Sequence, residues 1–139
     1  MKEAVVDTNV FIHAIVEDSD LHGEARALLY SLDRWYVPTI VLYELVWFFK
    51  RVGLDVAEVR RCIEAVLSST RCVVVPDTGR CTRRALSMIV QGAASLKHFN
   101  DLVILSTAIE TCRRIATYDG KLRSIAEKYG VEVLPKSIG

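Results

Sequence analysis

Four acidic side chains stand where the surrounding residues are mostly apolar. Asp7 ends a short β-branched run, Asp119 follows a second short apolar run, Glu44 is the only acid in an apolar stretch, and Asp101 opens another such stretch. A carboxylate among buried apolar residues is costly unless it is paired or bound to a metal. If the four converge, all-oxygen ligands favour hard cations such as Mg²⁺ or Mn²⁺. Such a cation can activate water and clamp a phosphodiester, so the pattern indicates metal-dependent hydrolysis.

Each acid also has a local structural interpretation. Asp7 and Asp119 follow expected strands and precede expected helices, where a carboxylate commonly caps the helix N-terminus. Asp101 lies in the first turn of an expected helix, where the helix dipole favours an acid. Glu44 can send its charge to solvent from its own helix. The joint pattern, rather than any single acid, therefore favours a site.

The elements that must position these acids follow from an alternation of strands and helices. Short apolar runs indicate strands at residues 3–6, 35–37, 72–75, 115–117 and 131–134, and helical apolar spacing fills the intervals. Alternation of this kind is typical of a parallel sheet with helices on both faces. We therefore expect a single α/β domain over residues 1–139, with its chemistry at the carboxyl ends of the strands.

Two helices close to the acids carry specific expectations. The segment 39–52 is apolar nearly all round, so it is buried or covered by a partner, and we expect a subunit interface there. Asn100 is expected to cap a helix over residues 101–113, and residues 93–99 before it are expected to form a loop.

A capping box is expected at a further helix start. Asp55 and Glu58 have the spacing of that motif. The residues expected on the core face of the helix that follows are Val56, Val59, Ile63, Val66 and Leu67.

Composition excludes several classes of protein. Hydrophobic residues make up 51% and charged residues 25%, which is typical of a globular chain. Eighteen basic and seventeen acidic residues give a net charge of +1, so nucleic acid would have to be bound by a local site. The N-terminus has no signal-peptide apolar region and no run reaches the ~18 residues of a membrane span, so we expect a cytoplasmic protein without membrane contact. The four cysteines contain no C-x-x-C pair and do not fit a zinc site or, in a reducing cytosol, a disulfide framework.

Four segments, in order and spacing, resemble the acidic motifs of the PIN-domain nucleases. They are Val5-Val6-Asp7-Thr8-Asn9, the helix bearing Glu44, Phe99-Asn100-Asp101-Leu102 and Ala116-Thr117-Tyr118-Asp119. The likeness covers essentially the whole chain. It implies a three-layer α/β/α fold with strand order 3-2-1-4-5, and metal-dependent cleavage of RNA by an endoribonuclease. The small single-domain form is most similar to the VapC toxins of type II toxin–antitoxin pairs, which implies a cognate antitoxin and a homodimer.

The resemblance also implies roles for individual residues. The implied metal-binding and catalytic acids are Asp7, Glu44, Asp101 and Asp119. Of these, Glu44 binds a second ion or orients the attacking water, and the other three form the main site for Mg²⁺ or Mn²⁺. The polar positions that support the site in the family are matched by Thr8, Asn9 and Thr117. Helix capping explains Thr8 or Asn9 about as well. The implied reaction is in-line attack on phosphorus by an activated water.

Basic side chains are weaker candidates for contacts with the RNA backbone. Arg83 and Arg84 lie on one expected helix, and Lys97 stands shortly before Asp101. Charged faces of surface helices are usually only solvated, so that interpretation stays beside the functional one.

Other classes of protein use similar acids. A phospho-acceptor receiver domain would use Asp7, Asp77 and Lys136, but it needs a second acid beside Asp7, where the chain has Val6 and Thr8. A haloacid-dehalogenase-like phosphatase needs an Asp two residues after its nucleophile, where the chain has an Asn. A catalytically silent PIN-like scaffold and an RNA-processing factor both remain open.

Overall fold

The computed structural model describes residues 1–138, and the chain forms a parallel sheet between two layers of helices. The strands are β1 (Glu3–Val6), β2 (Arg34–Pro38), β3 (Cys72–Val75), β4 (Arg114–Ala116) and β5 (Glu132–Leu134). They lie in the order β3-β2-β1-β4-β5, and all four pairings are parallel. The expected three-layer fold and strand order are confirmed. The domain expected over residues 1–139 includes residue 139, which lies outside the described residues.

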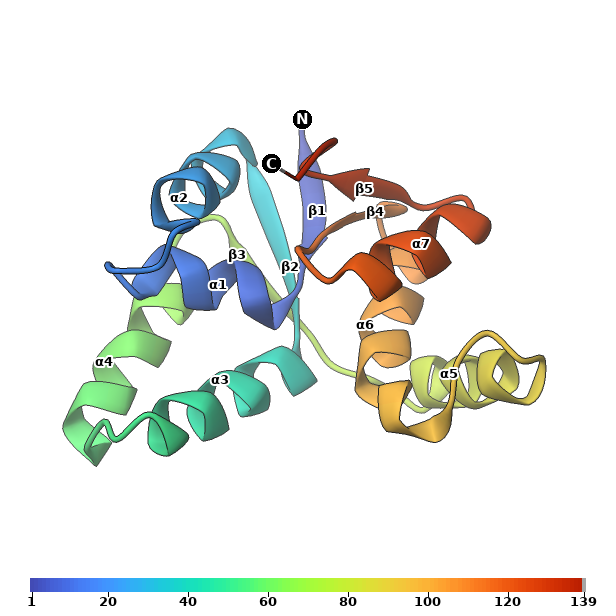
Figure 1. The fold of residues 1–139 in the computed structure, drawn as a ribbon, viewed down its shortest axis with the longest axis horizontal. Helices are drawn as coiled ribbons and strands as arrows, with labels where there is room; N and C mark the ends of the chain where they lie inside the picture. The colour runs from blue at the N-terminus through green and yellow to red at the C-terminus, as the bar shows by residue number, and fades with distance from the viewer. Residues whose placement is uncertain (139) are drawn as a thin grey trace.

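Helices connect the strands and cover both faces of the sheet (Figure 1). One layer consists of α1 (Thr8–Ile15), α2 (His22–Ser31), α3 (Thr39–Arg51) and α4 (Val56–Leu67). The other layer consists of α5 (Arg80–Val90), α6 (Phe99–Glu110) and α7 (Gly120–Lys128), with the 3₁₀ helix η1 (Leu96–His98) before α6. The chain moves outward from β1 to β3 and then returns to β4 on the other side of β1. Ligands of open α/β sheets bind outside the carboxyl ends of the strands at this reversal. None of the helices over residues 1–138 is long and apolar enough to cross a membrane.

The centre of the molecule is formed by β1, β4 and α6. The apolar residues Ala4, Val5, Val6, Ile115 and Ala116 of the two strands have no exposed surface. In α6, every residue from Leu102 to Ala108 is buried, which explains why the apolar residues of this helix show no single face. The first turn of α6 is thereby fixed at the reversal point, next to the end of β1.

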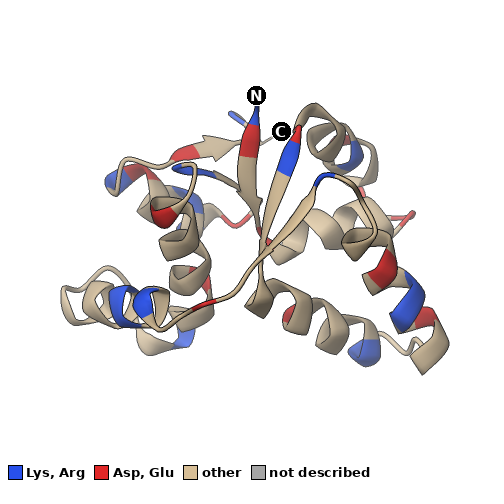
Figure 2. Cartoon of the chain, turned by 180° about the vertical axis from the view of Figure 1, so that it is seen from behind, with Lys and Arg blue, Asp and Glu red and all other residues tan. Residues whose placement is uncertain are grey.

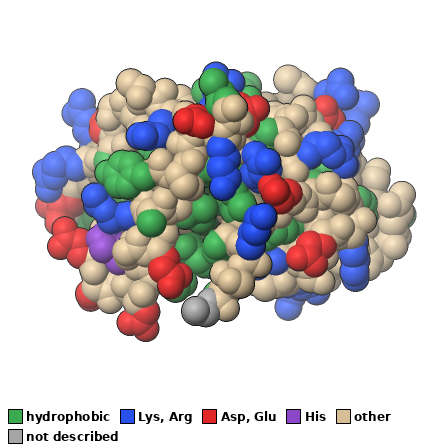
Figure 3. All heavy atoms as spheres, turned by 90° about the horizontal axis from the view of Figure 1, so that it is seen from above, with side chains coloured by type: hydrophobic (Ala, Val, Ile, Leu, Met, Phe, Trp, Pro, Cys, Tyr) green, Lys and Arg blue, Asp and Glu red, His purple; other side chains and the backbone are tan. Residues whose placement is uncertain are grey.

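Charges at the amino ends of the strands are paired across the sheet. Arg34 of β2 lies 3.3 Å from the Glu3 carboxylate of β1, and Arg114 of β4 pairs with Glu132 of β5. Arg114 also donates to the backbone carbonyl of Glu3 at 2.9 Å. Figure 3 shows this end of the molecule, where basic and acidic side chains are interspersed. Figure 2 likewise shows both signs of charge on both helical layers, as the net charge of +1 suggests.

The start of α6 differs from the sequence prediction. The loop predicted over residues 93–99 contains η1, which continues directly into a helix that begins at Phe99. The predicted Asn100 cap is therefore wrong, since His98 occupies the N-cap position and makes no side-chain cap hydrogen bond. The amide of Asn100 instead donates to Glu44.

Two helix ends also differ from the prediction, although the capping box of α4 is present as expected. α6 ends at Glu110 rather than at residue 113. Arg113 has a positive φ of 58°, which a helix does not allow, and its N–H donates to the Ala108 carbonyl. Val56 and Leu67 are exposed rather than on the core face of α4, because they are the first and last residues of the helix. The other three residues expected on that face pack inward.

α3 is buried on one face only. Its buried residues are Val41, Leu45 and Phe49, and its exposed apolar residues are Tyr43, Val46 and Trp47. An apolar outer face of this kind is typical of a helix that meets a partner. The subunit interface expected at α3 stays a prediction.

Candidate metal and catalytic site

The four acids singled out in the sequence line one cleft of about 410 Å³. Asp7 follows β1, Glu44 lies in α3, Asp101 lies in the first turn of α6, and Asp119 stands between β4 and α7. β1 and β4 are hydrogen-bonded neighbours, so the cleft lies at the carboxyl ends of the strands where the strand order reverses. The convergence expected from the sequence is present.

Asp7 is the most deeply buried of the four acids, with 4% of its surface exposed. Its carboxylate accepts the Thr8 N–H at 2.7 Å, the Thr117 hydroxyl at 2.7 Å and the Asn9 amide at 3.2 Å. Burial raises the pKa of Asp7 to about 7, the Thr117 hydrogen bond opposes this rise, and the negative charge of Asp101 adds to it. This carboxyl is thus held in place by neutral donors, and a nearby cation would favour its charged form.

The predicted supporting residues form a hydrogen-bond network that joins two of the acids. The Asn9 amide donates to the Thr117 hydroxyl at 3.3 Å, and its carbonyl accepts the Tyr118 N–H at 3.1 Å. The same Thr117 hydroxyl accepts the Asp119 N–H at 3.1 Å. Thr117 is fully buried. The network therefore fixes the end of β1 relative to the end of β4.

Glu44 is held by one donor at each carboxylate oxygen. The Thr8 hydroxyl donates to Oε1 at 2.5 Å, and the Asn100 amide donates to Oε2 at 3.3 Å. These two hydrogen bonds hold the Glu44 side chain toward the cleft rather than toward solvent. Asn100 is a supporting residue that sequence reasoning missed, because its place before Asp101 is equally typical of a helix cap.

Asp101 is the one acid of the cleft with a basic neighbour at ion-pair distance within residues 1–138. The imidazole Nδ1 of His98 lies 3.5 Å from its Oδ2. Burial raises the pKa of the Asp101 carboxyl, the charge of Asp119 raises it further, and the hydrogen bond from His98 lowers it. Like charges therefore face each other across the cleft with little compensation.

The two acids at the strand ends also act as helix caps. Asp7 accepts the first N–H of α1, and Asp119 accepts the N–H groups of Lys121 and Leu122 through Oδ1 at 2.9 and 3.1 Å. Both bonds of Asp119 use the same oxygen. Asp7 and Asp119 therefore cap helices and line the acidic cleft at the same time.

The donor set fits a hard divalent cation. Four carboxylates and the neutral oxygens of Thr8 and Asn9 line the cleft, and among the described residues Arg51 is its single Lys or Arg. Over residues 1–138, no three carboxylate, imidazole or thiol groups form a ready-made ligand cluster. Mg²⁺ does not require one, because it commonly keeps several waters and is bound by one or two carboxylates together with substrate phosphate.

The weaker RNA-binding candidates do not line this cleft. Arg84 lies 2.8 Å from Glu110, so its charge is compensated within α5 and α6. Arg83 and Lys97 are exposed on α5 and η1. Their roles stay predictions, and Arg51 is the basic residue that the structure adds to the cleft.

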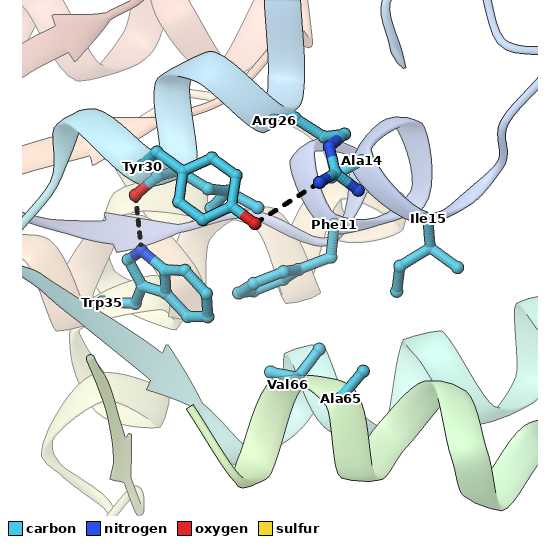
Figure 4. A pocket seen from close by; sticks show the side chains of 9 residues that line it. Phe11, Ala14, Ile15, Arg26, Tyr30, Trp35, Ala65 and Val66 are labelled. Carbon is cyan, nitrogen blue, oxygen red and sulfur yellow. Dashed lines mark hydrogen bonds between the residues drawn. The ribbon is translucent and has the colours of Figure 1, made fainter. Parts of the chain in front are cut away.

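Two other parts of the molecule, an apolar hollow and the surroundings of Asp77, lack a cluster of acids among the described residues. An apolar hollow of about 120 Å³ between α1, α2, β2 and α4 has no carboxylate in its lining, and Arg26 is its only charged lining residue over the described part of the chain (Figure 4). Asp77, the acceptor that a receiver domain would need, accepts the Gly79 and Cys81 N–H groups at the start of α5, at 2.8 and 3.1 Å. It is outside the acidic cleft, which weighs against the receiver alternative.

Comparison with known families agrees with this geometry. The sequence model of the PIN domain matches residues 4–128, which is most of the chain. The chain belongs to the PIN domain family. PIN-domain nucleases generally use divalent metal ions, which suits the acidic cleft of this PIN domain.

Two solved structures share the fold of this PIN domain. One is the Mycobacterium tuberculosis toxin VapC20, described as cleaving the sarcin-ricin loop, with a TM-score of 0.75 and 19% identity over 87% of this chain and 93% of that chain. The other is Rickettsia felis VapBC2 bound to a DNA fragment from its promoter, with a TM-score of 0.68 and 20% identity over 94% of this chain and 96% of that chain. At these identities the likeness concerns the fold. A comparison with the sequences of curated proteins gives no match.

Proposed function

We propose that this PIN domain is a metal-dependent endoribonuclease that hydrolyses RNA phosphodiester bonds. The observation that carries the proposal is the contrast between the two edges of the sheet. At the amino edge, the charges of Glu3, Arg34, Arg114 and Glu132 are paired. At the carboxyl edge, four acids meet in one cleft, and burial and repulsion raise the pKa of two of them. Such a concentration of negative charge favours a divalent cation.

Mg²⁺ or Mn²⁺ bound there supplies Lewis acidity, which lowers the pKa of water and offsets charge on the phosphate oxygens. Asp7, Asp101 and Asp119 are the proposed ligands of the main site. Glu44, held by Thr8 and Asn100, is placed to orient the attacking water or to bind a second ion. Thr117 and Asn9 keep the ligands in position, as supporting hydrogen bonds do at other metal sites.

The proposed biological role is that of the toxin in a type II toxin–antitoxin pair. It is supported by the likeness to VapC20 and VapBC2, each over most of both chains. The proposed partners are an RNA substrate, a cognate antitoxin and a second copy of this chain. A catalytically silent scaffold is disfavoured because all four acids are present in one cleft.

Cleavage of a mixed structured RNA by the purified protein tests the activity. The reaction is run with Mg²⁺, with Mn²⁺ or with chelator, beside Asp101→Asn and Glu44→Gln. We expect cleavage that chelator abolishes and that falls at least a hundredfold in Asp101→Asn. Cleavage that survives chelation, or that is equal in wild type and Asp101→Asn, would contradict the proposal.

Induced expression tests the toxin role. Wild-type expression is expected to arrest growth, and Asp101→Asn expression is not. Tyr30→Ala, at an exposed residue of α2 outside the cleft, serves as a folded control. If Asp101→Asn arrests growth as strongly as wild type, the arrest does not come from this site.

A further inference from the structure

An exposed aromatic ring stands beside the acids of the cleft. Trp47 lines the same cleft as Glu44 and Arg51, yet 57% of its surface is exposed. The other tryptophan, Trp35, is 8% exposed and donates its indole N–H to the Leu29 carbonyl. Trp35 is therefore explained by packing, and the exposure of Trp47 is not.

The position of Trp47 follows from helix geometry. Glu44, Trp47 and Arg51 occupy positions i, i+3 and i+7 of α3, so they form one stripe along the helix. Glu44 at one end of this stripe meets Thr8 and Asn100. The Trp47 ring therefore lies about one helical turn from Glu44. The exposed guanidinium of Arg51 lies about one turn further along α3.

The basic side chains of Lys50 and Arg51, which neighbour Trp47 in α3, suit the binding of a polyanion. Lys50 Nζ lies 5.9 Å from the centre of the Trp47 ring. Arg51 makes no ion pair with any residue over positions 1–138. A phosphate chain that approaches four carboxylates is repelled, and the charge of Arg51, which lines the cleft, offsets that repulsion, with Lys50 beside the Trp47 ring adding to it.

We infer that Trp47 is a stacking platform for an unpaired base of the RNA substrate, and that Arg51 contacts the phosphate beside that base. This inference rests on the proposed function and goes beyond it by naming two residues of α3 that contact the substrate beside the acids. An indole face stacks on any base whose own face is free, whereas bases within a duplex already stack on their neighbours. The platform therefore selects single-stranded RNA or loops over paired RNA.

The test measures RNA binding without cleavage. Asp101→Asn protein with Mg²⁺ is titrated with a random-sequence single-stranded 12-mer, and separately with a 12-base-pair RNA duplex, while Trp fluorescence and anisotropy are followed. Adding Trp47→Ala is expected to weaken single-strand affinity by about tenfold, to leave duplex affinity unchanged and to remove the fluorescence quenching. Trp47→Phe keeps an aromatic face and is expected to restore most of the affinity. Arg51→Ala is expected to lower the salt slope of single-strand binding by about 0.7.

Tyr30→Ala is the matched control. Tyr30 is 60% exposed and lies close to two guanidinium groups, those of Arg26 and Arg71, each 5.6 Å from its ring centre. It thus repeats the combination of aromatic ring and cations, but at the apolar hollow, away from the acids (Figure 4). Its substitution is expected to change RNA affinity less than twofold.

Several results would overturn the inference. Unchanged single-strand affinity in Trp47→Ala, or equal losses for single strand and duplex, would remove the stacking role. A Trp47→Ala protein that loses self-association but not RNA affinity would assign the ring to a contact between copies. Metal-dependent cleavage that requires Asp101 would leave the proposed function standing in those cases. If neither RNA binds to the parent protein, the stacking inference fails, and cleavage of the mixed structured RNA by wild type decides the proposed function separately.

Discussion

At the scale of single residues, the acids of the cleft differ in how they are held. Asp7 is buried and bonded to Thr8, Asn9 and Thr117, all of them neutral donors. Glu44 is bonded at both oxygens by side chains 36 and 56 residues away in the sequence. Asp7 and Glu44 are thus held in position by neutral donors, without an ion pair among the described residues. Because Asp7 is buried and lies near the negative charge of Asp101, its carboxyl is more easily protonated than an exposed one.

Asp7 is expected to make the stability of the metal-free protein depend on pH. Its folded-state pKa of about 7 lies above the unfolded value of 3.8, so between these values the folded state binds more protons than the unfolded state. The free energy of unfolding therefore falls as the pH rises through this window, by about 4 kcal/mol for this one group. Thermal and urea unfolding of chelated protein from pH 4 to pH 8 measures this fall.

The matched variant for that measurement is Asp7→Asn, which cannot titrate. Its stability is expected to depend less on pH over the same range, and Mg²⁺ is expected to stabilise wild type more than the variant at pH 8. A wild-type stability that rises between pH 5 and pH 8 in chelator would show that Asp7 is charged without a cation.

At the scale of elements, Asp119 has two separable roles. It caps α7 through Oδ1, and it lines the cleft. Asparagine caps a helix about as well as aspartate, whereas alanine does not. Asp119→Asn is therefore expected to retain stability and lose cleavage, and Asp119→Ala to lose cleavage and about 1 kcal/mol of stability. Unfolding midpoints and RNA cleavage rates of the two variants check this, and full cleavage by Asp119→Asn would limit Asp119 to capping.

The elements themselves were largely predictable, and the contacts between them were not. Apolar periodicity indicated all five strands and the helices between them, because burial imposes that spacing locally. It misplaced the start of α6, since η1 continues into the helix with no capping signal at His98. The four acids were found as a pattern along the chain. The contact of Asn100 with Glu44 and the opening of Trp47 to the cleft depend on how α3 and α6 pack, which local sequence does not encode.

At the scale of the whole molecule, two different stripes of α3 line two different hollows. One stripe of this helix carries Glu44, Trp47 and Arg51 along the acidic cleft. Another carries Ile40 and Tyr43, which line a groove of about 390 Å³ together with residues of β3 and α6, including Phe99 and others. Apolar and polar side chains both line this groove, and Tyr43 is exposed beside it, which favours the predicted homodimer at that second stripe.

Sedimentation at micromolar concentration tests the dimer. We expect wild type to sediment as a dimer and Tyr43→Asp as a monomer, because a buried unpaired carboxylate is costly. Tyr30→Asp changes an equally exposed tyrosine on α2 and is expected to stay dimeric. A monomeric wild-type protein would contradict the interface at α3.

The most direct test of the central claim is Mn²⁺ binding to chelator-treated protein, followed by electron paramagnetic resonance and calorimetry. Wild type is expected to bind Mn²⁺ saturably, with Mg²⁺ in competition, and Asp101→Asn is expected to bind it at least tenfold more weakly, because Asp101 is a proposed ligand. Arg83→Ala, outside the cleft, is expected to bind like wild type. Equal Mn²⁺ affinity in wild type and Asp101→Asn would contradict a metal site formed by these carboxylates.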